Sequence, residues 1–152
     1  MPVMNNTDTT ISYTIVNVAV NRPLFRDFAY KVNGLIGEEC IGSRVLINFS
    51  GLSQVGVITK INPDIDFDKS KLKEAKLLDK KAIIPKDVID VLQFGSNYYQ
   101  YPLGQCFNVA LPKLLRDGAP FSYEQIPALR LEDNLDEKKI SKLKSKEQIE
   151  II

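Results

Sequence analysis

The stretch that decides the fold is SRVLINFSGLSQVGVITKI, residues 43–61. Residues 43–49 alternate between apolar and other side chains, and Ser50-Gly51 then interrupts the run. Residues 54–61 form a second run rich in β-branched residues. Two such runs joined by the short Ser50-Gly51-Leu52-Ser53 loop predict a β-hairpin.

Two more strands are predicted before this hairpin. Residues 11–20 (ISYTIVNVAV) are rich in β-branched residues and end at Asn21-Arg22-Pro23. Residues 24–32 (LFRDFAYKV) alternate and end at the turn signal Asn33-Gly34. Several short strands separated by turns predict a small, curved β-sheet or partial barrel of the OB type.

Helices are predicted after the strands. Residues 62–81 suggest a loop that leads into a short strand, and apolar residues at helical spacing after Pro85 predict a helix over residues 86–99. Residues 106–115 predict a second helix, kinked or split in two by Pro112. The predicted fold class is therefore α+β, an OB-like sheet with two C-terminal helices.

One main core is expected in a chain of 152 residues with 44% apolar residues. The polar residues 1–10 are predicted to be a disordered lead-in, and residues 11–118 the folded domain. Residues 119–152 are predicted to be a linker, with one further strand over residues 123–131, followed by a helix over residues 134–152.

Several function classes are disfavoured by what the sequence lacks. It has no histidine, and its two cysteines, Cys40 and Cys106, are far apart, so free thiols are expected and histidine-dependent nucleophiles are excluded. No phosphate-binding loop or dinucleotide fingerprint is present. Asp64, Asp66 and Asp68 lack the glycine and glutamate of a calcium loop and suggest a solvated acidic loop. We expect no enzymatic activity and no cofactor in this segment.

Charge and hydropathy limit the partners further. No run of about 18 apolar residues occurs, so a cytoplasmic protein without a membrane partner is expected. The protein is also expected to be a monomer. The net charge of +1 disfavours a broad grip on duplex phosphates. Any nucleic-acid site should be small.

Two groups of aromatic residues stand out. The first lies on adjacent β segments with cations interleaved, and comprises Phe25, Phe28, Tyr30, Phe49, Arg22, Arg26, Lys31 and Arg44. Such a pattern suits base stacking, although burial in the core is the alternative that the pattern alone favours. The second group, Tyr98, Tyr99 and Tyr101, is predicted to wedge between a helix and the sheet.

Three ordered motifs carry a family resemblance. They are residues 18–24 (VAVNRPL) with Phe28-Ala29-Tyr30, then Gly42-Ser43-Arg44-Val45 with Phe49 and residues 56–58 (GVI), and lastly residues 98–104 (YYQYPLG) with residues 110–112 (ALP) and 115–116 (LR). In order and spacing they resemble the N-terminal 3′ DNA-end-binding domain of the primosomal protein N′ (PriA) family. The resemblance covers roughly residues 13–118, and residues 138–149 resemble the lead-in to the family's winged-helix domain.

The resemblance implies a DNA-binding module of an ATP-dependent 3′-to-5′ replication-restart helicase, whose zinc and Mg-ATP sites lie in a motor outside this chain. In the family this domain captures the 3′ end of the nascent leading strand at stalled forks, which orients primosome assembly. Motif matching places the 3′-end site at Phe28, Ala29, Tyr30, Ser50, Gly51 and Lys73. Ala29 stands where the family usually has an acidic residue, and Asn48-Phe49-Ser50 replaces its usual P-F-G turn, so altered bonding to the DNA end is expected.

The implied partner is single-stranded or forked DNA with a free 3′ end. A rival interpretation is a protein-interaction module, in which the sheet or the lysine-rich tail docks a single-strand-binding protein or another primosome protein. The near-neutral charge is compatible with both interpretations.

Overall fold

The computed structural model describes residues 12–66 and 68–122 of the chain. The chain divides after Phe121 into two compact units, and all strands and helices of the described residues belong to the first. In chain order they are β1 (Tyr13–Val20), β2 (Phe28–Asn33), η1 (Glu38–Cys40), β3 (Arg44–Phe49), β4 (Leu52–Ile61), η2 (Lys69–Lys71), β5 (Glu74–Leu77), α1 (Lys86–Tyr98), α2 (Leu103–Ala110) and α3 (Lys113–Arg116).

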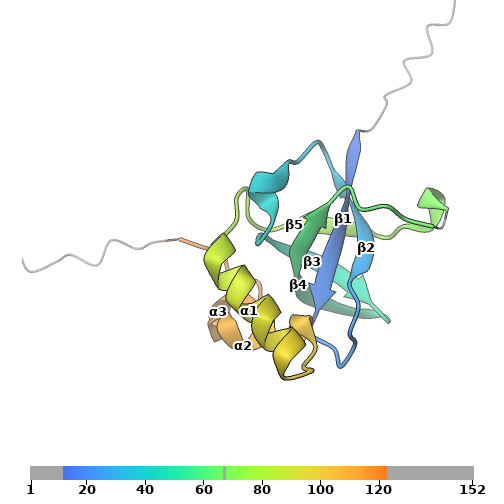
Figure 1. Ribbon diagram of the computed structural model, residues 1–152. Coiled ribbons are helices and arrows are strands. Elements are labelled where there is room, and N and C mark those ends of the chain that lie inside the picture. The colour runs from blue at the N-terminus through green and yellow to red at the C-terminus, as the bar shows by residue number, and fades with distance from the viewer. Residues whose placement is uncertain (1–11, 67, 123–152) are drawn as a thin grey trace, which may run out of the picture. The chain divides into compact units, whose positions relative to one another are not determined.

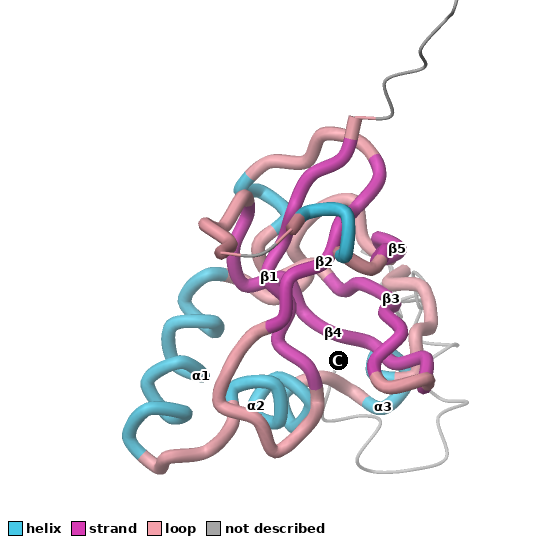
Figure 2. The backbone as a smooth tube through the Cα atoms, turned by 90° about the vertical axis from the view of Figure 1, so that its right-hand side faces the viewer, coloured by secondary structure: helices cyan, strands magenta, loops and turns pink. Residues whose placement is uncertain are grey.

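The five strands form a closed barrel in the order β1-β2-β5-β3-β4, with β4 pairing back onto β1 (Figures 1 and 2). All pairs are antiparallel except β2 with β5. The predicted OB-like α+β fold is confirmed. The short strand β5 completes the barrel because it bonds to β2 on one side and β3 on the other.

The β3–β4 hairpin is confirmed with a tighter turn than predicted. Phe49 pairs with Leu52, so that only Ser50 and Gly51 form the turn. Both have positive φ, 51° and 84°, which is the pattern of a two-residue hairpin turn that follows the strand twist. Glycine tolerates this conformation better than serine does.

Two apolar clusters explain the burial pattern. One fills the barrel and includes Val16, Val18 and Val45. The other lies between the barrel wall and the helices and includes Ala19 and Phe107. Because β1 contributes to both, almost all of its residues are buried, and it lacks the polar outer face of an ordinary surface strand.

Gly104 allows α2 to lie directly against the end of β1. A Cβ atom at this position would overlap the backbone of Val20, including its carbonyl oxygen. Only glycine lets the helix and the strand approach so closely.

Two predicted boundaries are corrected. The strand expected over residues 24–32 begins only at Phe28, because tight backbone turns precede it: the amide of Arg22 donates to the Val20 carbonyl at 2.6 Å, and that of Leu24 to the Arg22 carbonyl at 2.7 Å. The helix at residues 86–99 is confirmed as α1. The second helix starts earlier than predicted, and the predicted break at Pro112 divides it into α2 and α3.

The predicted lead-in (1–10), strand (123–131) and terminal helix (134–152) lie wholly or almost wholly outside the described residues, and the domain boundary at residue 118 stays a prediction. Among the described residues, no helix has the length and apolar character needed to cross a bilayer.

Candidate nucleic-acid interface

A pocket opens on the barrel where the start of β2, the end of β3 and the segment before β5 meet. Its volume is about 450 Å³, within the range of roughly 300–1,000 Å³ typical of pockets that hold small ligands. We call it the barrel pocket, and it is lined by Arg26, Asp27, Phe28, Ala29, Tyr30, Asn48, Phe49, Ser50, Lys71, Leu72 and Lys73.

The barrel pocket brings together five of the six residues that motif matching selected: Phe28, Ala29, Tyr30, Ser50 and Lys73. These come from three segments that are up to 45 residues apart in the chain (73 minus 28). Gly51 is not among the lining residues and supports the site through the hairpin turn, where its amide donates to the Asn48 side-chain oxygen at 3.1 Å.

Phe28 forms the aromatic wall. Its ring is half-buried and meets Phe49 edge to face, with ring centroids 4.8 Å apart. The Arg26 guanidinium lies 5.0 Å from the Phe28 centroid, in a cation–π contact. A flat base and a guanidinium can both stack on such a ring, so this wall suits nucleic-acid bases of any kind.

Tyr30 has a different role from the one predicted. It is only 4% exposed, belongs to the barrel core and donates its hydroxyl to the Asn48 carbonyl at 3.4 Å. With its ring packed in the core, Tyr30 forms the floor of the pocket, and Phe28 is left as the stacking surface. Burial in the core, the alternative to base stacking, therefore applies to Tyr30 and not to Phe25, which is exposed.

Two lysines give the pocket a positive rim. Lys71 and Lys73 are both exposed, and neither forms an ion pair with any residue that the structure describes. The backbone carbonyl of Lys73 accepts a hydrogen bond from the Lys31 amide at 3.0 Å, which fixes this segment against β2. Their ammonium groups are available to a phosphate at the pocket mouth.

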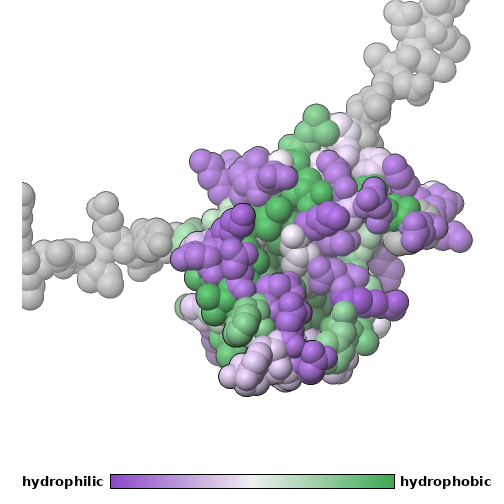
Figure 3. Space-filling view, viewed as in Figure 1, coloured by the Kyte–Doolittle hydropathy of each residue, from purple (hydrophilic) through white to green (hydrophobic). Residues whose placement is uncertain are grey.

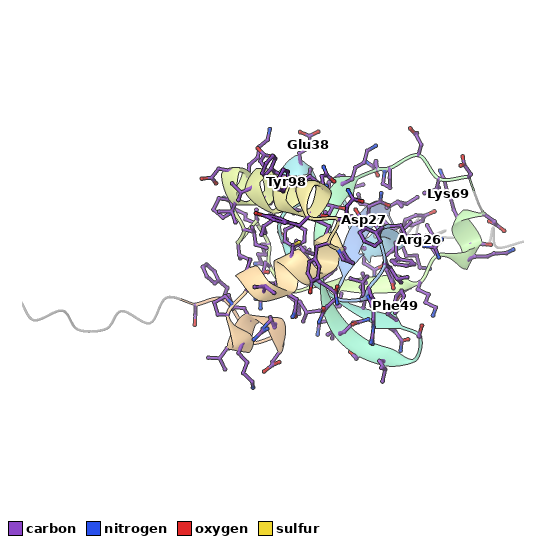
Figure 4. All side chains as sticks on the ribbon, turned by 60° about the horizontal axis from the view of Figure 1, so that its bottom comes forward. Arg26, Asp27, Glu38, Phe49, Lys69 and Tyr98 are labelled. Carbon is purple, nitrogen blue, oxygen red and sulfur yellow. The ribbon has the colours of Figure 1, made fainter. Side chains whose placement is uncertain are left out.

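Asp27 supplies a carboxyl group that motif matching did not include. Its side chain accepts a short hydrogen bond from the Thr59 hydroxyl. Burial raises the pKa of Asp27, and the hydrogen bond from Thr59 partly opposes that rise. Figure 4 shows Asp27 beside Arg26, and both residues line the barrel pocket. In the sequence, the only sign that Asp27 lines the pocket is its position next to Phe28.

Arg44 is corrected from a candidate DNA contact to a structural residue. Its guanidinium is fully buried and paired with Asp79, with Nη2 2.7 Å from Oδ1 and Nε 2.8 Å from Oδ2. Its Nη1 donates to the carbonyls of Leu115 and Ala119, both at 2.8 Å. Arg44 thus ties β3 to the segment after α2.

The tyrosine cluster is also corrected. Tyr98 is 69% and Tyr99 75% exposed, so they do not wedge between helix and sheet. Tyr98 packs on Phe94 and Tyr99 instead, with centroids 5.7 and 4.9 Å apart. The prediction was wrong because α1 packs chiefly against α2 and not against the sheet, and the two tyrosines lie at its exposed end.

Asp68, one of the three acidic-loop residues, has a structural role. Asp68 caps η2 by accepting from the Ser70 amide at 2.9 Å and its hydroxyl at 2.7 Å, which lowers the pKa of Asp68. Within residues 12–66 and 68–122, no cluster of three His, Cys, Asp or Glu side chains could hold a metal ion. Cys40 is buried, Cys106 is partly exposed, and both thiols are free.

The sequence of this chain is similar to those of known proteins. The 3′ DNA-binding domain (3′BD) family of PriA matches residues 17–112. Replication restart protein PriA of Haemophilus influenzae is 35% identical over 105 residues, which cover 68% of this chain and 14% of that protein. Replication restart protein PriA of Buchnera aphidicola is 28% identical over 102 residues, or 66% of this chain and 14% of that protein.

The chain thus spans about one seventh of the length of these two relatives. The family match covers more than half of the chain and includes β2, the β3–β4 hairpin and the segment before β5, which together build the barrel pocket. The chain therefore belongs to the PriA family of 3′ DNA-binding domains.

Proposed function

We propose that this domain captures the 3′ end of the nascent leading strand at a stalled replication fork and thereby orients primosome assembly. The observation that carries the proposal is the barrel pocket. One aromatic wall, one carboxyl group and two lysines that form no ion pair with a described residue surround a space suited to a single nucleotide. The family membership supports DNA as the ligand.

Each part of the pocket suits a different part of a terminal nucleotide. The base stacks on Phe28 without regard to its identity, since every base offers a flat π-face. Lys71 and Lys73 face the phosphate that links the terminal nucleotide to the next one. These contacts hold a strand end without reading its sequence.

The free 3′ hydroxyl is recognised by closure of the pocket and by Asp27. The buried residues Tyr30 and Leu72 close the floor, so the strand cannot continue through it. A hydroxyl group can hydrogen-bond to the Asp27 carboxyl, whereas a 3′-phosphate there is too large and meets like charge when Asp27 is ionised. Asp27 thus offers a carboxyl group in a pocket where Ala29 offers none.

In the proposed full-length protein the domain holds the DNA end while a separate ATP-dependent helicase motor, with zinc and Mg-ATP sites of its own, moves along the fork. This segment carries no catalytic step. We propose that it acts as a monomer in the cytoplasm.

A titration with fluorescent oligonucleotides that end in a 3′ hydroxyl or a 3′ phosphate tests the proposal. The hydroxyl end should bind more tightly. Phe28→Ala should weaken that binding by about 1–3 kcal/mol, as expected when stacking on one base is lost. Equal affinity for both ends, or no binding to either, would contradict end capture.

Lysine variants provide a matched control. Lys73→Ala should weaken binding and make it less dependent on salt, because one phosphate contact is lost. Lys80→Ala removes the same charge from an exposed position outside the barrel pocket and should leave affinity almost unchanged. Equal effects of the two substitutions would mean that only overall charge matters.

Docking of a single-strand-binding protein or another primosome protein is a second candidate function, and an exposed face of α1 favours it. Val91, Phe94 and Tyr98 recur at helical spacing and are each more than 60% exposed, and Figure 3 shows hydrophobic residues on the side where the helices lie. Exposed apolar patches often mark protein interfaces. A partner retained in high salt without DNA, and lost with Phe94→Ala and Tyr98→Ala, would support this function.

A further inference from the structure

A second depression lies directly beside the barrel pocket. Its volume is about 360 Å³, and it runs between the β1–β2 loop and the C-terminal part of α1. We call it the amide groove, defined by Phe25, Arg26, Asp27, Gln93, Asn97 and Gln100. Arg26 and Asp27 line both spaces, so the two spaces adjoin at these residues.

Three side-chain amides give the amide groove its chemistry. Gln93 Nε2 donates to Asn97 Oδ1 at 3.2 Å, and Gln100 Nε2 donates to the Asn97 carbonyl at 2.7 Å. These bonds hold the amides in place. The Asn97 amide nitrogen and the Gln93 and Gln100 side-chain oxygens form no hydrogen bond with any described residue, so donors and acceptors are both open on this exposed surface.

This mixture suits the edge of a base better than a phosphate. Base edges present donors and acceptors side by side, and Asn and Gln are the side chains that commonly bond to them. A phosphate would require cations, and Arg26 is the only cation among the described residues that line the groove.

Phe25 supplies a flat surface in the same groove. It is 71% exposed, although most aromatic side chains in a small barrel are buried. Isolated exposed apolar residues are common and need no explanation. Phe25 differs because it lines a groove together with the amides and lies two residues from Asp27 and three from Phe28.

We propose that the amide groove is a second nucleotide subsite, in which the base next to the terminal one stacks on Phe25 and bonds to the amides of α1. This inference rests on the proposed function, because it takes the terminal nucleotide to occupy the barrel pocket. The strand then passes over Arg26 and Asp27 from one space to the other.

A thermodynamic cycle tests the proposal with the full 152-residue chain. Wild-type protein and Phe25→Ala are each titrated with a hexanucleotide that has a free 3′ hydroxyl, and with the same hexanucleotide abasic at the second position from that end. In the wild type, loss of the second base should weaken binding about 5- to 150-fold. Phe25→Ala should cause a similar loss on the intact strand and little further loss on the abasic strand.

Leu114→Ala is the matched control, since Leu114 is 71% exposed, as Phe25 is, and lies outside both spaces. It should bind both strands as the wild type does. Independent, additive losses from Phe25→Ala and from the abasic position would overturn the second subsite, and so would no loss from Phe25→Ala. If the second subsite fails this test but the wild type still prefers a 3′ hydroxyl to a 3′ phosphate, end capture is intact. If the wild type also lacks that preference, end capture itself has failed.

Discussion

Removing the carboxylate of Asp79 should destabilise the domain strongly. Asp79 accepts three hydrogen bonds from Arg44, two from the guanidinium and one from the backbone amide at 3.0 Å. Both side chains are at least 95% buried. In Asp79→Ala the guanidinium keeps its bonds to two carbonyls but stays buried without a counter-charge.

The expected cost follows from this burial. Breaking a buried ion pair from one side costs about 3–5 kcal/mol, because an uncompensated charge stays out of water. Small domains have a free energy of unfolding of about 5–15 kcal/mol, so the variant should lose a large part of its stability. Arg44→Met combined with Asp79→Leu should be more stable than Asp79→Ala, since no unpaired charge is left.

Urea unfolding followed by circular dichroism measures these differences as shifts in midpoint at constant slope. Asp117→Ala is the matched control, because it removes a carboxylate from the exposed pair with Lys113, which are 3.1 Å apart. That substitution should cost at most about 0.5 kcal/mol. If Asp79→Ala cost no more than Asp117→Ala, the reasoning about the buried pair would be refuted.

Two further predictions concern stability. Gly104→Ala should destabilise the domain by about 1–3 kcal/mol or more, because its Cβ overlaps the Val20 backbone. Gly95→Ala, in open space on α1, should instead stabilise it by about 0.5–1 kcal/mol. If thermal unfolding showed both variants to be stabilised, or both destabilised, the result would be inconsistent with the close approach of α2. The second concerns pH. The pKa of Asp27 is raised in the folded state, so between the unfolded pKa of about 3.9 and the raised pKa the folded protein binds more protons than the unfolded chain. The free energy of unfolding therefore falls as the pH rises through this window. Asp27→Asn removes this loss, so the stability of the variant relative to wild type should increase across that window and then level off; a difference that is independent of pH would exclude a raised pKa.

The strands, the hairpin and the break at Pro112 could be predicted because local patterns encode them. Residues 43–61 carry their own alternation and turn signal, and proline cannot continue a helix. The site residues were found only through the motif resemblance. Five of the six meet in the barrel pocket, although they lie on three separate segments.

Other features depend on contacts between distant segments, to which local patterns are blind. A charged residue in an alternating strand normally faces water, but Arg44 is buried because Asp79, 35 residues away, compensates its charge. Tyr30 and Phe25 are both aromatic residues near one turn, yet one lies in the core and the other is exposed. Thus the sequence by itself determined the fold class, the family and five of the eleven residues that line the barrel pocket, because alternation, turn signals and ordered motifs are properties of the chain. Only the tertiary structure decided which side chains face the barrel pocket, since burial and charge pairing arise when segments far apart in the sequence pack together.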